Sequence, residues 1–312
     1  MEKGKKMALL VGCNYPNTPN ELHGCHNDVL AMREVLITRF GFDPKRVEIL
    51  IDKPGSSTMP TGANIKSTLN RMVDQAEQGD VLFFHYSGHG TLIKPHNSSK
   101  KEEAIVPCDF NLITSVDFRQ LVNRVPKGAT FTILSDSCHN GGLIDKETEQ
   151  IGPYTIPDDA FTIPTNPYKP KEIPFQSILQ YFTSLTNKIS TDIGTHLVDV
   201  FGQDASLMFL HEPVNKPLKP DEGILLSGCQ TNETSADVEI MENGRKPCGA
   251  FSNAVQMVLK ENPGRALTNR EIVMLARKIL LVQHFNKQHP CLYCSKENAD
   301  AVFLSPPQKP CP

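Results

Sequence analysis

The sequence predicts an α/β fold in which a mostly parallel β-sheet is covered by helices on both faces. Short uninterrupted apolar runs, such as 81–84 and 131–134, are typical of strands that are buried on both sides. Between such runs lie segments whose apolar residues recur at helical spacing, as in 27–40. The alternation of these two patterns indicates strands joined by crossover helices, which is how parallel sheets are built.

The expected elements follow one another in a regular order. An apolar run over 6–13 predicts the first strand, and the helix over 27–40 ends at Gly41, because glycine commonly follows the last turn of a helix. A strand over 47–51 and a helix over 61–77 come next. Beyond the two apolar runs, we expect helices over 175–186 and 192–201, a strand over 223–227, helices over 250–259 and 268–282, and a last strand over 301–304.

Composition divides the chain into three regions. Residues 1–150 carry the alternating pattern and form a large first region. Residues 151–222 hold nine of the 24 prolines, so we interpret them as a long Pro-rich linker insertion, a kind of segment that is usually functional or disordered. Residues 223–312 form a smaller region that is expected to complete the same sheet.

Charge and hydropathy exclude several classes of protein. A net charge of −3 implies no broad basic surface, so no nucleic-acid partner is expected. The apolar run near the N-terminus is too short for a signal peptide or a membrane span, so no membrane partner is expected either. Nine cysteines, an odd number, favour reduced thiols. We expect a monomer in the cytoplasm or nucleus, with leaderless export left open.

Two glycine-flanked loops carry the candidate chemistry. His89 follows the run at 81–84, and Cys138 follows the run at 131–134. Open parallel sheets place their active sites at the carboxyl ends of the strands, so the two loops should be neighbours. A histidine can accept the proton of a thiol, and the sulfur can then attack a carbonyl carbon. The amides of Gly90 and Cys138 are candidate donors for an oxyanion hole.

Simpler explanations compete with this catalytic dyad. A single cysteine among nine is commonly a small buried apolar residue, and a single histidine is commonly structural. A catalytic metal held by His85, His89, Cys138 and His139 is disfavoured, because neighbouring residues of a strand point to opposite faces. We interpret His139 as structural. A structural zinc at Cys291 and Cys294 is not expected, because no second close pair completes four ligands.

Several motifs together resemble one family of cysteine peptidases. The segments 85–90 (HYSGHG) and 136–139 (DSCH) resemble the histidine and cysteine motifs of metacaspases, and the segments 12–15, 22–28 and 224–230 fit that family too. The resemblance covers nearly the whole chain, with the insertion where plant type II members carry their linker. It implies a caspase-like fold and an endopeptidase that is made as a zymogen and processes itself in the linker. Proteolysis and programmed cell death are the roles that it suggests.

The resemblance also implies a role for particular residues. His89 becomes the general base and Cys138 the nucleophile, and the specificity pocket is lined by Cys25, Asp28, Ser87 and Asp136. Two carboxylates that face one pocket repel each other unless a cation joins them, so we expect protein or peptide substrates with Arg or Lys before the cut. A preference for Asp is excluded. Asp28 has an alternative reading as a residue that only interacts with a helix dipole.

Calcium is the one cofactor that the resemblance raises. Many metacaspases need it, and the matching acids are Glu102, Glu103, Asp117 and Asp145. The paired acids that the family carries before the Asp117-Phe-Arg segment are replaced here by Ser115 and Val116. Losing charged oxygen ligands weakens a calcium site. We therefore expect that no cofactor is required and that any dependence of activity on calcium is weak or dispensable.

Self-cleavage is expected after Lys171. The linker contains no arginine, because none lies between Arg124 and Arg245. Of the other linker lysines, Lys188 ends an expected helix. The remaining three each precede a proline, which fits poorly on the far side of a scissile bond: Lys169, Lys216 and Lys219. Lys171 lies in a Pro-rich stretch expected to be exposed and free to enter the cleft. A catalytically silent caspase-fold interaction protein is the alternative, which predicts loss of the dyad, yet both residues are present.

Overall fold

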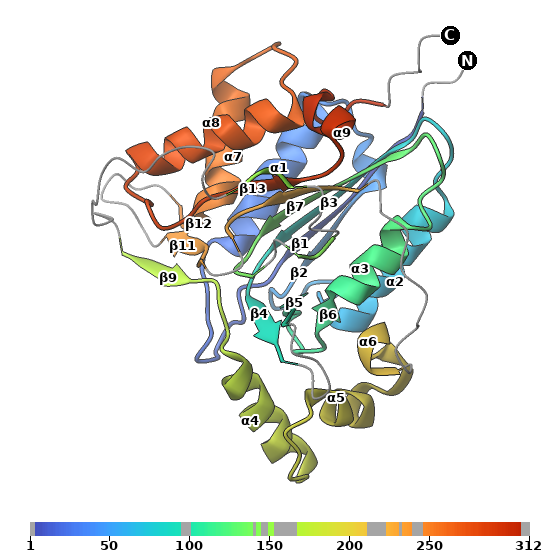
Figure 1. Ribbon diagram of the computed structural model, residues 1–312, viewed down its shortest axis with the longest axis vertical. Helices are drawn as coiled ribbons and strands as arrows, with labels where there is room; N and C mark the ends of the chain where they lie inside the picture. The colour runs from blue at the N-terminus through green and yellow to red at the C-terminus, as the bar shows by residue number, and fades with distance from the viewer. Residues whose placement is uncertain are drawn as a thin grey trace.

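The computed structural model describes residues 4–94, 101–139, 142–144, 149–152, 167–210, 223–230, 233–238 and 246–306. A central sheet runs through the structure with helices around it (Figure 1). It has seven strands in the order β2-β1-β3-β7-β10-β13-β8. Neighbouring strands from β2 to β10 pair in parallel, whereas β13 is antiparallel to both β10 and β8. The bounds are β1 Lys6–Gly12, β2 Val47–Ile51, β3 Val81–Ser87, β7 Thr130–Asp136, β8 Glu149–Ile151, β10 Ile224–Ser227 and β13 Cys291–Tyr293.

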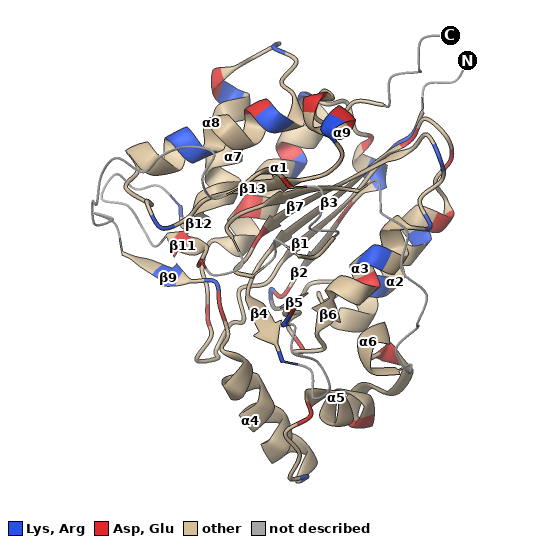
Figure 2. Ribbon diagram, in the orientation of Figure 1, with Lys and Arg blue, Asp and Glu red and all other residues tan. Residues whose placement is uncertain are grey.

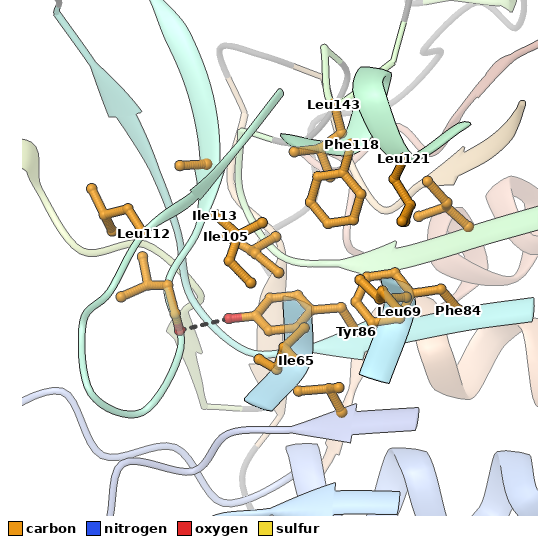
Figure 3. Close-up of a cluster of buried hydrophobic side chains, with 14 of the residues drawn as sticks. Ile65, Leu69, Phe84, Tyr86, Ile105, Leu112, Ile113, Phe118, Leu121 and Leu143 are labelled. Carbon is orange, nitrogen blue, oxygen red and sulfur yellow. Dashed lines mark hydrogen bonds between the residues drawn. The ribbon is translucent and has the colours of Figure 1, made fainter. Parts of the chain in front are cut away.

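Helices cover both faces of this sheet, which confirms the predicted α/β class (Figure 1). Along β1, Leu9 packs into one apolar cluster and Leu10 into the other, because successive side chains of a strand point to opposite faces. Figure 3 shows the first cluster, which brings together side chains from α2, α3 and β3, among them Leu69, Phe118 and Phe84. The helix bounds are α1 Cys25–Thr38, α2 Gly62–Asp74, α3 Ser115–Val122, α7 Ala250–Glu261, α8 Asn269–Val282 and α9 Lys296–Asp300.

Two small sheets lie beside the central one. The first consists of β4 Gly90–Ile93, β5 Glu102–Ile105 and β6 Ile113–Thr114. The second consists of β9 Tyr168–Pro170, β11 Ala236–Val238 and β12 Cys248–Gly249, with β11 in the middle. Each strand has two to four residues, which is too short for an alternating pattern to be visible in the sequence.

The linker region contributes helices to the same body. They are α4 Phe175–Thr186, α5 Ile193–Phe201 and the short α6 Leu207–Leu210. The bounds of α4 match the prediction, and the Asp192 side chain caps α5 by accepting hydrogen bonds from its first amides. No Lys, Arg, Asp or Glu occurs in α4, which is tan throughout in Figure 2, and its apolar side chains join the cluster that also contains Phe84.

One predicted element is wrong. Residues 301–304 do not form a strand, because Val302 makes only an isolated bridge with Thr268 after α9 has ended. The strand that extends the central sheet in this part of the chain is β13, whose three residues are flanked by polar and proline residues and gave no signal. Among the residues described by the structure, no helix is long and apolar enough to cross a bilayer.

Candidate active site

The two predicted loops leave the sheet side by side. Strands β3 and β7 pair in parallel with Ser87 opposite Asp136, so the residues that follow them emerge at the same edge. His89 is 3% exposed and Cys138 is fully buried. The loops touch at Gly90, where a Cβ atom would lie 1.8 Å from the carbonyl oxygen of Cys138. Only glycine allows this approach, and it brings the predicted histidine and cysteine loops together.

The orientation of His89 is set by main-chain and phenol groups. Its Nε2 lies 2.7 Å from the carbonyl oxygen of Asn20, which can only accept, so Nε2 carries the proton. Nδ1 is buried without a hydrogen-bond partner among the described residues, and the main chain of Lys171 lies beside the ring. Burial lowers the pKa of His89 to about 4, against the opposing hydrogen bond to Asn20. The imidazole is therefore neutral at pH 7, with an unprotonated Nδ1 that can accept a proton.

Two tyrosines hold the backbone of His89. The Tyr15 hydroxyl accepts a hydrogen bond from the His89 amide at 3.0 Å, and its ring lies 4.7 Å from the imidazole. The Tyr86 hydroxyl donates to the His89 carbonyl oxygen at 2.8 Å. The sequence analysis named neither contact. Asn20 was also missed, and because it acts through its main chain, its side chain could give no signal.

The main chain of Lys171 lies across the cysteine loop. Its carbonyl oxygen accepts hydrogen bonds from the amides of Gly90 at 3.0 Å and Cys138 at 3.2 Å, the two donors expected for an oxyanion hole. The Lys171 amide donates to the Ser235 carbonyl oxygen at 2.8 Å. The Ser235 amide lies 3.0 Å from the sulfur of Cys138 and donates to it. One carbonyl is thus fixed by two amides next to the thiol.

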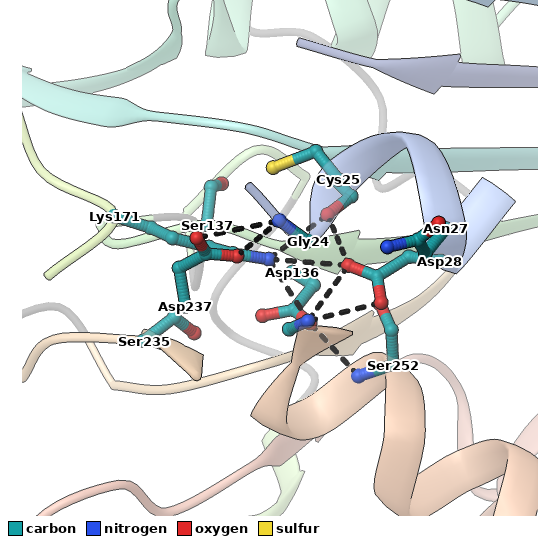
Figure 4. A network of polar contacts seen from close by, with 12 residues as sticks. Gly24, Cys25, Asn27, Asp28, Asp136, Ser137, Lys171, Ser235, Asp237 and Ser252 are labelled. Carbon is teal, nitrogen blue, oxygen red and sulfur yellow. Dashed lines mark hydrogen bonds and ion pairs between the residues drawn. The ribbon is translucent and has the colours of Figure 1, made fainter. Parts of the chain in front are cut away.

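The Lys171 side chain fills a pocket lined by carboxylates (Figure 4). Its Nζ lies 3.3 Å from Asp136, 3.5 Å from Asp28 and 2.9 Å from the Ser87 hydroxyl. Burial opposes its charge, but the carboxylates outweigh burial and raise the pKa of Lys171 well above its usual value. Burial raises the pKa of Asp28 to about 7, although Lys171 opposes this shift. The site therefore favours a cation.

The prediction that Lys171 is exposed is wrong. The side chain is 0% exposed, because the carboxylate pocket already encloses it. Residues on either side are extended: Lys169 pairs with Asp237 of β11, Glu172 bridges to Gly90, and the Ile173 amide donates to the Gly90 carbonyl oxygen at 3.1 Å. The chain from β9 onwards thus crosses the site as an extended strand.

The walls of the pocket come from segments that are far apart in the sequence. The Gly249 amide lies 2.9 Å and 3.0 Å from the two carboxylate oxygens of Asp28, and the Ser252 amide donates to Asp136 at 2.8 Å. Asp28 is thus more than a partner of the helix dipole, because its carboxylate accepts these bonds and faces Lys171. Cys25 is fully buried beside the pocket, where burial raises the pKa of its thiol, opposed by Lys171.

Sequence reasoning missed a third carboxylate, Asp237. It accepts hydrogen bonds from the His23 amide at 2.8 Å and the Gly24 amide at 3.0 Å, at the start of α1 (Figure 4). Its charge also helps to raise the pKa of Lys171. Asp237 belongs to a three-residue strand far along the chain, so neither spacing nor periodicity pointed to it.

The remaining histidines make other contacts. His85 Nε2 lies 3.1 Å from the Ser252 hydroxyl, and burial lowers the pKa of His85 to about 3. His139 Nε2 lies 3.0 Å from the carboxylate of Glu172, the residue that follows Lys171. Across the described ranges, no three His, Cys, Asp or Glu side chains are grouped closely enough to hold a metal ion. The alternative in which these histidines and Cys138 bind a catalytic metal therefore finds no ligand cluster.

The described calcium candidates have protein partners. Asp117 caps α3 and also accepts from the Ser206 hydroxyl at 2.6 Å and the Leu207 amide at 3.0 Å. Glu102 accepts from the Ser115 hydroxyl at 2.5 Å and lies 3.7 Å from Arg119. Glu103 accepts from the amide of Gly142. The fourth candidate, Asp145, lies outside the described residues, as do Lys216 and Lys219. Most of the described carboxylate oxygens are thus engaged by protein donors.

Comparison with known proteins identifies the class. The family model described as "Caspase domain" (Peptidase_C14) matches residues 5–302. The chain is 54% identical to Metacaspase-9 of Arabidopsis thaliana, over 97% of this chain and 98% of that protein. It is 36% identical to Metacaspase-6 of the same plant, over 96% and 99% of the two chains. The chain therefore belongs to the caspase family of cysteine peptidases, among its metacaspases, and the resemblance inferred from the motifs is confirmed.

A solved structure supports the fold alone. The crystal structure of protein GSU0716 from Geobacter sulfurreducens superposes with a TM-score of 0.64 and covers 97% of this chain and 100% of its own. The two sequences are 18% identical. At that identity the similarity extends to the arrangement of the elements and not to the chemistry.

Proposed function

We propose that this metacaspase cleaves proteins after Lys or Arg with Cys138 and His89, and that it is made as a zymogen whose first cut follows Lys171. One observation carries the proposal. The Lys171 side chain fills the carboxylate pocket while its carbonyl oxygen accepts from the Gly90 and Cys138 amides. A basic residue recognised by its side chain and a carbonyl held beside a thiol are the two requirements for cleavage after that residue.

The proposed reaction follows from these contacts. Nδ1 of His89 takes the proton of the Cys138 thiol, and the sulfur attacks the carbonyl carbon of Lys171. Negative charge develops on the carbonyl oxygen, where two amides already donate. The imidazolium then gives its proton to the leaving nitrogen of Glu172, and the peptide bond breaks. Water hydrolyses the thioester and regenerates the thiol.

The pocket supports a preference for basic side chains. With one cation inside, two carboxylates within 3.5 Å of it are balanced in part, whereas an Asp side chain would add another negative charge to a buried site. One carboxylate oxygen, Oδ1 of Asp136, has no hydrogen-bond partner among the described residues and offers an acceptor to the larger guanidinium of arginine. Substrates with Lys or Arg before the cut therefore fit.

The uncut linker supports the zymogen part of the proposal. While residue 171 remains joined to residue 172, its side chain occupies the pocket that another substrate would need. Cleavage breaks the peptide bond between residues 171 and 172, and the new C-terminus at residue 171 can then leave the cleft. We place the mature enzyme in the cytoplasm or nucleus, acting as a monomer in protein turnover and programmed cell death.

Self-processing of the purified chain tests this function. We expect fragments of 171 and 141 residues, the smaller beginning at Glu172. Cys138→Ala alone should stay intact, Lys171→Arg should be cut at the same bond, and the uncharged Lys171→Met should resist cutting there. N-terminal sequencing and intact mass spectrometry distinguish these outcomes. A fragment that begins elsewhere, or processing that persists in Cys138→Ala, would contradict the proposal, and an intact wild-type chain that labels no active-site probe would favour the silent interaction protein.

A further inference from the structure

A single residue outside the dyad makes contacts with both reacting partners. The Ser235 amide donates to the Cys138 sulfur at 3.0 Å, and the Ser235 carbonyl oxygen accepts from the Lys171 amide at 2.8 Å. Ser235 lies between β10 and β11, immediately before the strand that pairs with β9. Its position therefore affects both the sulfur, where negative charge must form, and the register of the bound chain.

The Gln288 side chain makes three hydrogen bonds to the segment that connects β10 and β11. It is 4% exposed and lies just before β13. Its Oε1 accepts from the Ala236 amide at 3.1 Å, while Nε2 donates to the Gly228 carbonyl oxygen at 3.0 Å and to the Ser235 hydroxyl at 3.1 Å. One buried carboxamide thus makes hydrogen bonds to Ser235 itself, to the next residue Ala236 and to Gly228, which follows β10.

The surroundings leave little freedom for a different arrangement. A Cβ atom on Gly228 would lie 2.7 Å from the Ser235 hydroxyl oxygen, so these two segments approach too closely for a larger residue. The neighbouring His289 makes a second connection, because its amide donates to the Glu233 carboxylate at 2.8 Å. The lead-in to β13 thus holds the β10–β11 connection at two successive residues.

We propose that Gln288 is a positioning residue for peptide cleavage, which holds Ser235 where its amide stabilises charge on Cys138 and its carbonyl oxygen receives the substrate amide. The inference rests on the proposed cysteine-peptidase function. Gln288 itself touches neither the sulfur nor Lys171 in the described contacts. A buried polar group whose partners are removed is costly, so loss of the carboxamide should let the Ser235 peptide shift to find other partners. The Ser235 amide would then stabilise negative charge on the Cys138 sulfur less well, which should raise the pKa of this thiol.

The test compares Gln288→Met, which keeps the volume and removes all three bonds, with Asn269→Leu. Asn269 is an equally buried carboxamide that donates to the Asn298 carbonyl oxygen, far from the site, so it controls for lost stability. The first readout is the rate of Cys138 alkylation by iodoacetamide against pH, measured by peptide mass spectrometry in a Lys171→Ala background that leaves the pocket unfilled. The second is kcat and KM for an Arg-terminated reporter, measured on processed enzyme.

We expect Gln288→Met to move the midpoint of alkylation upward by about one pH unit, which corresponds to about 1.4 kcal/mol. Its kcat/KM should fall about tenfold, and Asn269→Leu should change neither quantity. Gln288→Asn keeps a neutral carboxamide but is one methylene too short to reach the three partners together. It should give a shift in the same direction and tests the proposal where the methionine variant does not fold.

The inference would be overturned by a folded variant in which only the melting temperature is lowered, with the midpoint of alkylation within about 0.3 pH unit of wild type and kcat/KM within about twofold. Equal shifts in Gln288→Met and Asn269→Leu would overturn it too. The alkylation profile needs no turnover. Failure of the wild-type enzyme to cleave the reporter would therefore refute the proposed function, while the alkylation midpoint would still test whether Gln288 positions Ser235.

Discussion

Replacing Asp136 by asparagine should remove most of the selectivity for basic residues. The Asp136 carboxylate is fully buried, lies 3.3 Å from Lys171 Nζ and accepts from the Ser252 amide at 2.8 Å. Asparagine has nearly the same shape, and its carbonyl oxygen can keep the hydrogen bond from Ser252. The change therefore removes one charge from the pocket without creating a cavity.

The size of the effect follows from burial. Breaking a buried ion pair by removing one partner costs about 3–5 kcal/mol, because the other charge is left without compensation. Asp28 and Asp237 remain near the cation, so we expect the lower end of this range. At about 1.4 kcal/mol for each tenfold change, kcat/KM for an Arg-terminated reporter should fall by about two powers of ten.

Two reporters separate loss of selectivity from loss of catalysis. A Met-terminated peptide has a side chain of similar length without charge, so its slow cleavage should be unchanged or faster in Asp136→Asn. The ratio of kcat/KM for the Arg and Met peptides is the quantity to measure, and an Asp-terminated peptide should stay uncut by the wild type. Asp28→Asn provides the matched comparison on the opposite wall of the pocket.

Two results would refute this reasoning. The first is Asp136→Asn with Arg cleavage within tenfold of wild type, which would mean that the carboxylate does not recognise the substrate. The second is an equal loss for the Arg and Met peptides, which would mean that the substitution disturbs the cysteine loop two residues further along. Efficient cleavage after Asp by the wild type would also contradict the pocket described here.

The remaining predictions concern the base and calcium. His89→Ala should lower kcat on the order of 10³-fold, and retention of one tenth of the activity in the variant would contradict the role of the base. Because burial holds the pKa of His89 near 4, protonation of this base should lower the wild-type rate only as pH approaches that value. Burial raises the pKa of Asp28 to about 7, so kcat/KM for basic substrates should begin to fall below pH 7, where the pocket loses negative charge. Removal of calcium by a chelator should leave most of the activity, because Ser115 and Val116 supply no carboxylate and Asp117 already accepts from protein donors. Activity that a chelator abolishes and millimolar calcium restores would show that the remaining acids suffice.

The sequence was informative where long elements position the chemistry. Buried strands of five to seven residues, such as those before His89 and Cys138, are visible as apolar runs, and parallel pairing then aligns their ends. The helices α4 and α5 were found for the same reason, since apolar spacing over nine to twelve residues is a strong signal. Neighbouring loops at the edge of the sheet could therefore be inferred without a structure.

The contacts that complete the site could not be inferred in this way. Asn20 and Ser235 act through main-chain groups, which are the same for every residue type and leave no pattern. Asp237 comes from a strand too short to show alternation. Lys171 was expected to be exposed because a lysine in a Pro-rich segment normally is, and only the position of the two distant carboxylates explains its burial.

The pocket is built from residues that precede the linker and residues that follow it. Asp28 from α1 is held by the Gly249 amide, Asp136 from β7 by the Ser252 amide, and the start of α1 by Asp237. Each carboxylate of the N-terminal part therefore depends on a group that follows residue 223. The proposed cut after Lys171 would separate these parts covalently, yet β10 pairs with β7 through four residues within the central sheet. Because the nucleophile follows a strand of the same sheet that would join the two fragments, we expect the proposed processing to open the cleft and leave the pocket intact.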